Sequence, residues 1–275
     1  MSDRRLTPAN GHVAHVSLLG LVTADRFVTG DRARVTASLA DLLTRPDGPR
    51  DRQVLHGDRL LVLERREGHA FVQAEKDGFC GYVALGALGP DWAATHIIAA
   101  PASHLYSEPN LKRPEVGTLS FGAKIAVTAR HGRFAATATG HFVPEQHLRP
   151  VDLPFTDPVE VAMLFLGSPY LWGGNSRSGL DCSGLVQAAL LACGIACPGD
   201  SDLQWASVGA RLAEGTPPRR GDLLFWPGHV AMAADATTMI HANAFRMAVT
   251  LEGIAEAIAR IDAAGDGPML GIRRP

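Results

Sequence analysis

Cys182 stands in the run Asp-Cys-Ser-Gly-Leu-Val at 181–186, where a glycine-rich turn leads into an apolar segment of helical length. Asp181 suits the N-cap position of that helix, and Gly194 suits its end. Cys182 then lies in the first turn, where free backbone N–H groups and the positive end of the helix dipole favour a thiolate. The pattern predicts a nucleophilic cysteine at a helix start.

Two histidines downstream are candidates for the base that such a thiol needs. We expect strands at His229–Ala233 and 238–242, joined by a short turn. A hairpin centred on Asp235 places His229 and His241 opposite each other, and their even separation puts both rings on one face of the sheet. We expect His229 to act as general base and His241 to orient it, which gives the set of groups found in a cysteine hydrolase.

Other interpretations of these residues stay open. Cys182, His229 and His241 are all competent zinc ligands, but no Cys-x-x-Cys or His-x-x-x-His spacing accompanies them, so we expect no metal and no cofactor. Cys182 could instead be a small buried hydrophobe, which is the usual place of a free cysteine. Asn243, on the same strand face as His241, is a weaker candidate for the orienting residue.

The elements around these residues predict an α+β domain. Helices come first and a meander of strands follows, which is typical of α+β rather than parallel α/β proteins. The expected order is a helix from Pro158 that stops at Gly167, the Cys182 helix, strands at Leu223–Trp226 and around the two histidines, a strand at 247–251, a helix at 254–261 and a closing strand near Ile272.

Residues 31–150 have a different texture, with short β-type runs broken by glycine and proline, which favours small all-β barrels. A loose pattern of roughly 60 residues occurs twice, which predicts a tandem pair. Its first copy has Gly57, Gly68 and Gly81-Tyr82-Val83; its second has Gly122, Gly132 and Gly140-His141-Phe142-Val143. We therefore predict an extension at 1–30, barrels at 31–90 and 91–150, and a catalytic domain at 151–275.

Composition narrows the class of protein. The 275 residues are 46% apolar and 20% charged, which is enough for buried cores in one to three domains. A net charge of −2 argues against nucleic-acid or anionic-membrane partners. With Cys182 assigned to chemistry, three cysteines remain, and this odd number argues against a disulfide framework, although a Cys193–Cys197 bridge is an alternative. Because no apolar run has the length of a signal peptide or a membrane span, we expect a cytoplasmic protein.

Several ordered motifs resemble those of the NlpC-type cell-wall cysteine peptidases, papain-like enzymes that cut peptidoglycan stem peptides. They are Asp-Cys-Ser-Gly-Leu-Val at 181–186, Gly-Asp-Leu-Leu-Phe-Trp at 221–226, His229-Val230 and Ile240-His241-Ala242. The upstream repeat resembles the bacterial SH3-like domains that often precede them, although Gly68-His69 and Gly132-Arg133 replace the usual Gly-Trp. The resemblance implies a papain-like domain in which a helix-borne cysteine packs against an antiparallel sheet, after two SH3-like barrels.

The resemblance also implies roles for residues beside the thiol. Tyr170, twelve residues before Cys182, is similar to a tyrosine that helps to hold the oxyanion, with a backbone N–H as the other donor. A packed aromatic under the loop is the alternative for Tyr170. Asp181 and Ser183 are expected to contact substrate amides, while helix capping is an equally good account of both.

In members of this family that act on short free peptides, an acidic residue at the position of Asp200 and a tyrosine of the first barrel bind the amino terminus of the peptide. Tyr82 is the candidate tyrosine, and Asp51 is a candidate for a further acidic group. An ammonium held by carboxylates makes strong charge-assisted contacts. Asp200 could also be a simple turn residue, since Gly199 replaces the arginine usual there.

The resemblance implies a γ-D-glutamyl-L-diamino acid endopeptidase of the dipeptidyl-peptidase VI type. The expected substrate is a recycled fragment, L-Ala-γ-D-Glu-diaminopimelate, with a free amino terminus, cut before meso-diaminopimelate. Two alternatives stay open: a papain-like amidase or acyltransferase that uses the same thiol, and a non-catalytic protein that binds cell-wall fragments.

Overall fold

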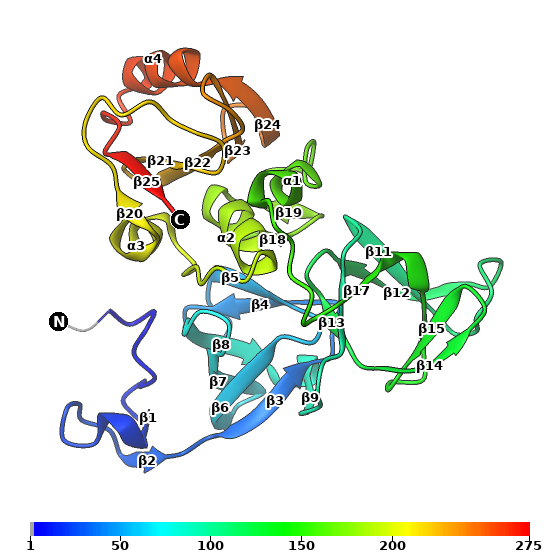
Figure 1. The fold of residues 1–275 in the computed structure, drawn as a ribbon. Helices are drawn as coiled ribbons and strands as arrows, with labels where there is room; N and C mark the ends of the chain where they lie inside the picture. Colours follow the sequence, from blue (N-terminus) through cyan, green and yellow to red (C-terminus); the bar gives the residue numbers. More distant parts are fainter. Residues whose placement is uncertain (1–2) are drawn as a thin grey trace. The chain divides into compact units, whose positions relative to one another are not determined.

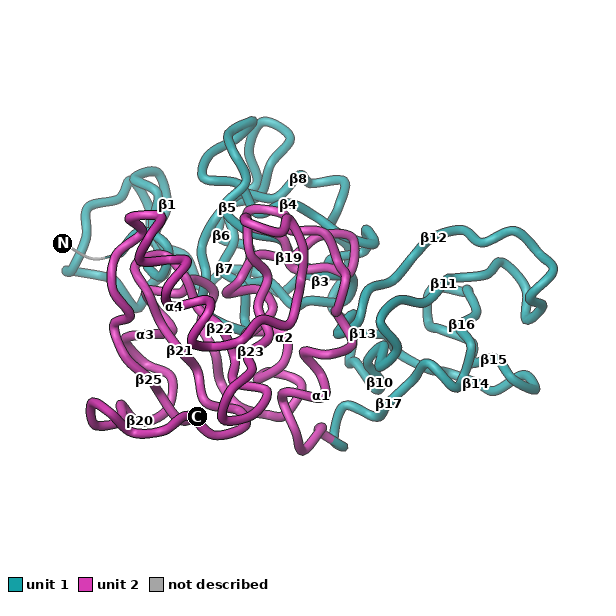
Figure 2. Tube along the Cα trace, turned by 90° about the horizontal axis from the view of Figure 1, so that it is seen from above, with its two compact units in different colours: residues 1–153 teal, residues 154–275 magenta. Residues whose placement is uncertain are grey.

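The computed structural model describes residues 3–275. The chain forms two compact units, residues 1–153 and residues 154–275 (Figure 2). The first unit is built of strands and short 3-10 turns, and the α-helices of the described chain lie in the second (Figure 1). None of the helices in residues 3–275 is long and apolar enough to cross a membrane.

A seven-stranded antiparallel sheet forms the first barrel, in the order β5-β4-β8-β7-β6-β3-β9. Its core is a cluster of buried aliphatic side chains closed by Phe79. The elements are β3 (Asp31–Val35), β4 (Leu39–Leu43), β5 (Arg50–Leu55), β6 (Arg59–Arg66), β7 (His69–Ala74), β8 (Cys80–Ala84), the 3-10 turn η2 (Leu85–Ala87) and β9 (Leu88–Pro90).

The next strands repeat the same pairings in the same chain order. They form a five-stranded sheet, β12-β11-β16-β15-β14, and a three-stranded sheet, β13-β10-β17, over a core of their own. The elements are β10 (His96–Ile98), β11 (Ala102–Tyr106), β12 (Glu115–Ser120), β13 (Lys124–Ile125), β14 (Val127–His131), β15 (Phe134–Thr137), β16 (Phe142–Pro144), η3 (Glu145–His147) and β17 (Leu148–Pro150). The predicted tandem repeat thus has a structural counterpart, and the SH3-like class of its second copy stays a prediction.

The amino-terminal segment packs against the first barrel. Its short strands β1 (Val13–His15) and β2 (Arg26–Val28) pair in parallel and flank the 3-10 turn η1 (Val16–Leu18). Val13 is fully buried in a cluster that includes Phe71 and Cys80 of the barrel. These contacts make the segment part of the first unit.

Asp58 is a buried charge within the first unit. Its carboxylate lies 3.0 Å from Nζ of Lys76 and 2.6 Å from Nζ of Lys124, and its side chain is 3% exposed. Burial raises the pKa of Asp58, but the two ammonium groups offset this and hold the pKa below its usual range. Since Lys124 belongs to β13 and Asp58 precedes β6, the triad ties the two barrels together.

The second unit carries helices on a six-stranded antiparallel sheet, in the order β20-β25-β21-β22-β23-β24 (Figure 1). Helix α2 packs against β22 and β23, and α4 covers the sheet face that carries Leu224, Ala233 and Met239. The elements are α1 (Pro158–Met163), β18 (Asn175–Ser176), β19 (Gly179–Leu180), α2 (Cys182–Ala192), α3 (Ser201–Ser207), β20 (Ala210–Arg211), β21 (Leu223–Trp226), β22 (His229–Ala233), β23 (Thr238–Asn243), β24 (Ala248–Gly253), α4 (Ile254–Ala264) and β25 (Gly271–Arg274). The predicted α+β class of this unit is confirmed.

Asp58→Asn tests the triad. We expect the free energy of unfolding to fall by about 2–3 kcal/mol at pH 7, because two lysines lose their shared counter-charge. Since the pKa of Asp58 is depressed in the folded state, this stabilisation is present above the unfolded pKa of about 3.9 and is lost as the pH falls through the folded value. Urea denaturation measures the change. The control Asp31→Asn removes an exposed partner of Arg65 and should change stability by less than about 0.5 kcal/mol, so equal effects would contradict the role of Asp58.

Candidate active site

Helix α2 begins at Cys182, as predicted. Asp181 is its N-cap, and its carboxylate accepts hydrogen bonds from the backbone N–H of Gly184 at 2.5 Å and of Gly173 at 3.0 Å. The same side chain therefore starts the helix and holds the preceding loop. A Cβ added at Gly184 would lie 2.4 Å from the carbonyl oxygen of Gly174, so only glycine lets the loop approach this closely.

The thiol of Cys182 faces the start of β22. Its Sγ lies 3.9 Å from the carbonyl oxygen of Gly228, the residue before His229, and the side chain is buried. Tyr170 is close enough to Cys182 and Asp181 to feel their charges. Burial raises the pKa of the Tyr170 hydroxyl, and the negative charges of Cys182 and Asp181 raise it further. The backbone N–H of Tyr170 donates to the carbonyl of Met247, which fixes the loop segment that carries Tyr170. The structure thus brings the predicted thiol, phenol and first imidazole to one end of the sheet.

Nε2 of His229 and Nδ1 of His241 form a hydrogen bond of 2.9 Å, with the ring centroids 5.2 Å apart. The predicted pairing of this hairpin is wrong: each residue of one strand faces a partner two residues further along the other strand than expected. Met232 faces Ile240, which centres the hairpin on Ala236 and makes the two histidines diagonal neighbours. Diagonal neighbours share a face, so the even spacing still brings the rings together.

Asp235 explains the shifted register. Its carboxylate accepts hydrogen bonds from the backbone N–H of Thr237 and of Thr238, both at 2.8 Å. The backbone N–H of Ala234 then donates to the carbonyl of Thr238, which closes a three-residue loop over 235–237. Three-residue loops of this kind are common in hairpins.

His241 is fully buried, and His229 is partly buried. Burial and, to a smaller extent, the neighbouring His241 lower the pKa of His229 to about 3. Burial also lowers the pKa of His241 to about 4, although the carboxylate of Glu252 opposes the shift. The two rings are therefore neutral at pH 7. Since Nε2 of His229 is engaged by His241, Nδ1 of His229 is the ring nitrogen left for a thiol proton.

The predicted substrate contacts near the thiol have local partners. The hydroxyl of Ser183 donates to the carboxylate of Asp181 at 2.9 Å, so both residues belong to the helix start. Asp200 is the N-cap residue of α3, where its side chain makes no capping hydrogen bond. Asn243, the alternative orienting residue, donates to the hydroxyl of Thr250 and accepts from the backbone of Arg246, which assigns it to the turn.

Tyr82 lies in a pocket of about 210 Å³ in the first unit. Glu64 lines the same pocket, and Nδ2 of Asn10 donates both to Glu64 at 3.2 Å and to the hydroxyl of Tyr82 at 3.1 Å. Asp51, the residue suggested from the sequence, instead pairs with Arg4 at 2.6 Å. The acidic side chain beside Tyr82 is therefore that of Glu64, whereas the sequence suggested Asp51.

Two acidic residues beside predicted site residues were not identified from the sequence. Glu64 lies beside Tyr82, and Oε2 of Glu252 lies 3.0 Å from Nε2 of His241. The signal for Glu252 is the second hairpin. A turn centred near Phe245 and Arg246 pairs His241 with Thr250 and makes Glu252 its diagonal neighbour. No comparable local signal exists for Glu64, because its neighbour Tyr82 comes from β8, two strands further along the chain.

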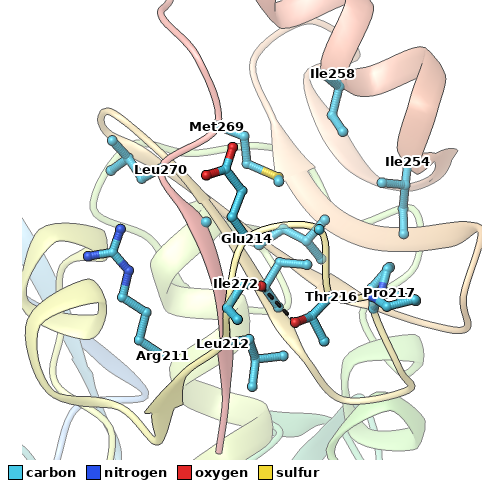
Figure 3. A pocket seen from close by; sticks show the side chains of 15 residues that line it. Arg211, Leu212, Glu214, Thr216, Pro217, Ile254, Ile258, Met269, Leu270 and Ile272 are labelled. Atoms are coloured by element: carbon cyan, nitrogen blue, oxygen red, sulfur yellow. Dashed lines mark hydrogen bonds between the residues drawn. The ribbon is translucent and has the colours of Figure 1, made fainter.

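The second unit has another pocket, of about 750 Å³ (Figure 3). Leu212, Ile254, Ile258 and Met269 give it a mainly apolar lining, with Glu214 nearby. The residues that line this pocket do not include Cys182, His229, His241 or Tyr170. Within residues 3–275, no group of three or more histidine, cysteine or acidic side chains is arranged to hold a metal ion, and all four cysteines are free thiols.

Comparisons with known proteins match two segments of the chain to families and give several relatives. The profile of the NlpC/P60 family matches residues 167–260, and that of the bacterial dipeptidyl-peptidase SH3 domain matches residues 42–88. Dipeptidyl-peptidase 6 of Lysinibacillus sphaericus is 28% identical over 245 residues, which are 77% of this chain and 87% of the relative. Gamma-D-glutamyl-L-lysine dipeptidyl-peptidase of Bacillus subtilis is 30% identical over 53% of this chain, which spans 52% of that relative.

Solved structures agree on the fold. The crystal structure of an NlpC/P60 family protein from Bacillus cereus superimposes with a TM-score of 0.74 at 19% identity, over 89% of this chain and 99% of that chain. At this identity the match concerns the fold.

Alkylation tests the reactivity of the thiol. We expect iodoacetamide at pH 7 to label Cys182 at least about tenfold faster than Cys80, because burial raises the pKa of Cys80 to about 12 while Cys182 has a helix start and a base beside it. Peptide mapping by mass spectrometry measures both rates in one sample. His229→Ala should slow the labelling of Cys182 alone. Equal rates for the two thiols would exclude an activated Cys182.

Proposed function

The chain is a cysteine peptidase with an NlpC/P60 domain at residues 167–260, and we propose that it hydrolyses the γ-D-glutamyl–diamino acid bond of peptidoglycan stem peptides. The observation that carries this proposal is the hydrogen-bonded pair His229–His241 at the strand end where the Cys182 thiol contacts Gly228. Two relatives named as dipeptidyl-peptidases, one of them specific by name for γ-D-glutamyl-L-lysine, support the choice of bond.

In this proposal Cys182 is the nucleophile and His229 the general base. Nδ1 of His229 takes the thiol proton, and the sulfur attacks the γ-carbonyl carbon of D-glutamate. The protonated imidazole then returns its proton to the leaving amine of the diamino acid. Water, deprotonated by His229, hydrolyses the thioester and releases the dipeptide acid.

The oxyanion that forms in both steps needs hydrogen-bond donors at a fixed place. The backbone N–H of Cys182, at the first position of α2 and next to the sulfur, is one donor in this proposal. We assign the second donor to the hydroxyl of Tyr170, which stays protonated at neutral pH because burial and the nearby charges raise its pKa. Two such donors stabilise the developing charge without reorganisation.

We propose that the protein recognises its peptide substrate by binding the free amino terminus. Glu64 and the hydroxyl of Tyr82 already accept hydrogen bonds from the two-proton donor Nδ2 of Asn10, and an ammonium offers the same kind of donor with a full charge. Asp200 is the acidic candidate in the catalytic unit. The preferred substrate is then L-Ala-γ-D-Glu-diaminopimelate, and we propose recycling of murein fragments in the cytoplasm as its setting.

Stem peptides with free and acetylated amino ends test the substrate. We expect L-Ala-γ-D-Glu-meso-diaminopimelate to be cut to L-Ala-D-Glu, and acetylation to lower kcat/KM by about 100-fold, because two charge-assisted contacts are lost. Mass spectrometry of the products measures both. Cys182→Ala should abolish cleavage, and Cys193→Ala is the matched control. Cleavage of acetylated or cross-linked stems in preference to the free peptide would refute recognition of the amino terminus.

Glu64→Gln tests the first barrel separately. We expect kcat/KM for the free peptide to fall about 10- to 100-fold, since the neutral amide cannot pair with an ammonium. The activity on the acetylated peptide and the alkylation rate of Cys182 should not change. Asp31→Asn, a change of charge at an exposed site of the same barrel, is the control. Parallel losses on both peptides would place the effect of Glu64 in folding rather than in recognition.

A further inference from the structure

The line of contacts behind the thiol continues past His241. Oε2 of Glu252 lies 3.0 Å from Nε2 of His241. Arg260 of α4 holds both oxygens of Glu252 with two hydrogen bonds of 2.8 Å, and its guanidinium lies 4.6 Å from the ring centre of Phe245. We propose that Glu252, held by Arg260, is a positioning residue that sets the protonation of the two imidazoles for thiol activation.

The sheet brings Glu252 to this place. β24 pairs with β23 so that His241 faces Thr250, and Glu252 is therefore on the same sheet face, one diagonal step away. The side chain of His241 is fully buried, and that of Glu252 is 16% exposed. Their contact is shielded from most of the solvent. In such a place charges interact more strongly than they do at the protein surface.

The carboxylate decides which tautomer His241 adopts. An ionised carboxylate can only accept a proton, so the nearby Nε2 of His241 carries the hydrogen and Nδ1 keeps its lone pair. Nδ1 then accepts the Nε2–H of His229, which leaves the lone pair of His229 on Nδ1 for the thiol proton. The opposite tautomer of His241 would put the proton of His229 on Nδ1 and block the base. In the resting structure Nε2 of His241 has no aligned hydrogen-bond partner, so Glu252 acts here through its charge.

Two elements carry the charged side chains that act on the pair. Glu252 of β24 raises the pKa of both imidazoles, and Arg260 of α4 lowers it. Arg260 also holds the pKa of Glu252 below its usual value, so the carboxylate stays ionised. Asp266 acts on Arg260 rather than on the rings. When His229 becomes protonated, the nearest carboxylate is the one that stabilises it.

Glu252→Gln removes the charge and keeps the shape. We expect kcat/KM to fall about tenfold through kcat, with KM unchanged, because the substrate does not touch this residue. The alkylation of Cys182 at pH 7 should slow, since the imidazolium that forms when His229 takes the thiol proton loses its stabilising carboxylate. Asp262→Asn, on the exposed side of α4, is the matched control and should leave kcat/KM and the alkylation rate unchanged. Alkylation by iodoacetamide needs no peptide, so this readout is independent of the proposed substrate.

A double variant separates positioning from simple stability. If Glu252 acts through His241, Glu252→Gln should add less than about twofold to the loss caused by His241→Ala. Full additivity of the two losses would overturn the proposal. A Glu252→Gln protein with the wild-type kcat and the wild-type rate of Cys182 alkylation would overturn it as well. A lower melting temperature with an unchanged alkylation rate would assign Glu252 to stability alone and would also overturn the proposal.

Discussion

A partly buried hydrogen bond between two neutral imidazoles controls the chemistry of the second unit. His229 and His241 meet because β22 and β23 are adjacent and place both rings on one sheet face. Burial lowers both pKa values, so neither ring is protonated at neutral pH before the reaction. In open water the same rings would rotate and would compete with solvent for every hydrogen bond. The dry sheet face therefore supplies both the orientation of the base and its proton affinity, and any change that wets this face affects both together.

Two separate scaffolds meet at the thiol. The sheet carries the imidazoles, whereas the carboxylate of Asp181 organises the start of α2 and the loop at Gly173 by hydrogen bonds to backbone N–H groups. The scaffolds touch where Sγ of Cys182 contacts the carbonyl of Gly228. This division explains why the motifs of the site are short and lie far apart in the sequence.

Local patterns predicted much of this molecule. The Cys182 helix, its cap, the strands of the histidines and the α+β order follow from capping residues and apolar periodicity, and the papain-like domain and an SH3-like first barrel agree with the comparisons. The predicted centre of the hairpin is wrong by one residue, and the strand pairing therefore by two, because the Asx-type contacts of Asp235 shift the turn. Glu64 and Glu252 were missed since their partners come from other strands, and a single sequence does not state which strands become neighbours.

The matched pairings of the two barrels allow their residues to be compared position by position. In the first barrel Glu64 pairs with Phe71, and Phe71 with Tyr82; in the second, Ala129 pairs with Ala136, and Ala136 with Phe142. The second copy thus offers a methyl and a bare phenyl ring where the first offers a carboxylate and a phenol. Substitutions at Ala129 and Phe142 would therefore leave in place the two groups of the first barrel, on Glu64 and Tyr82, that we propose bind the ammonium.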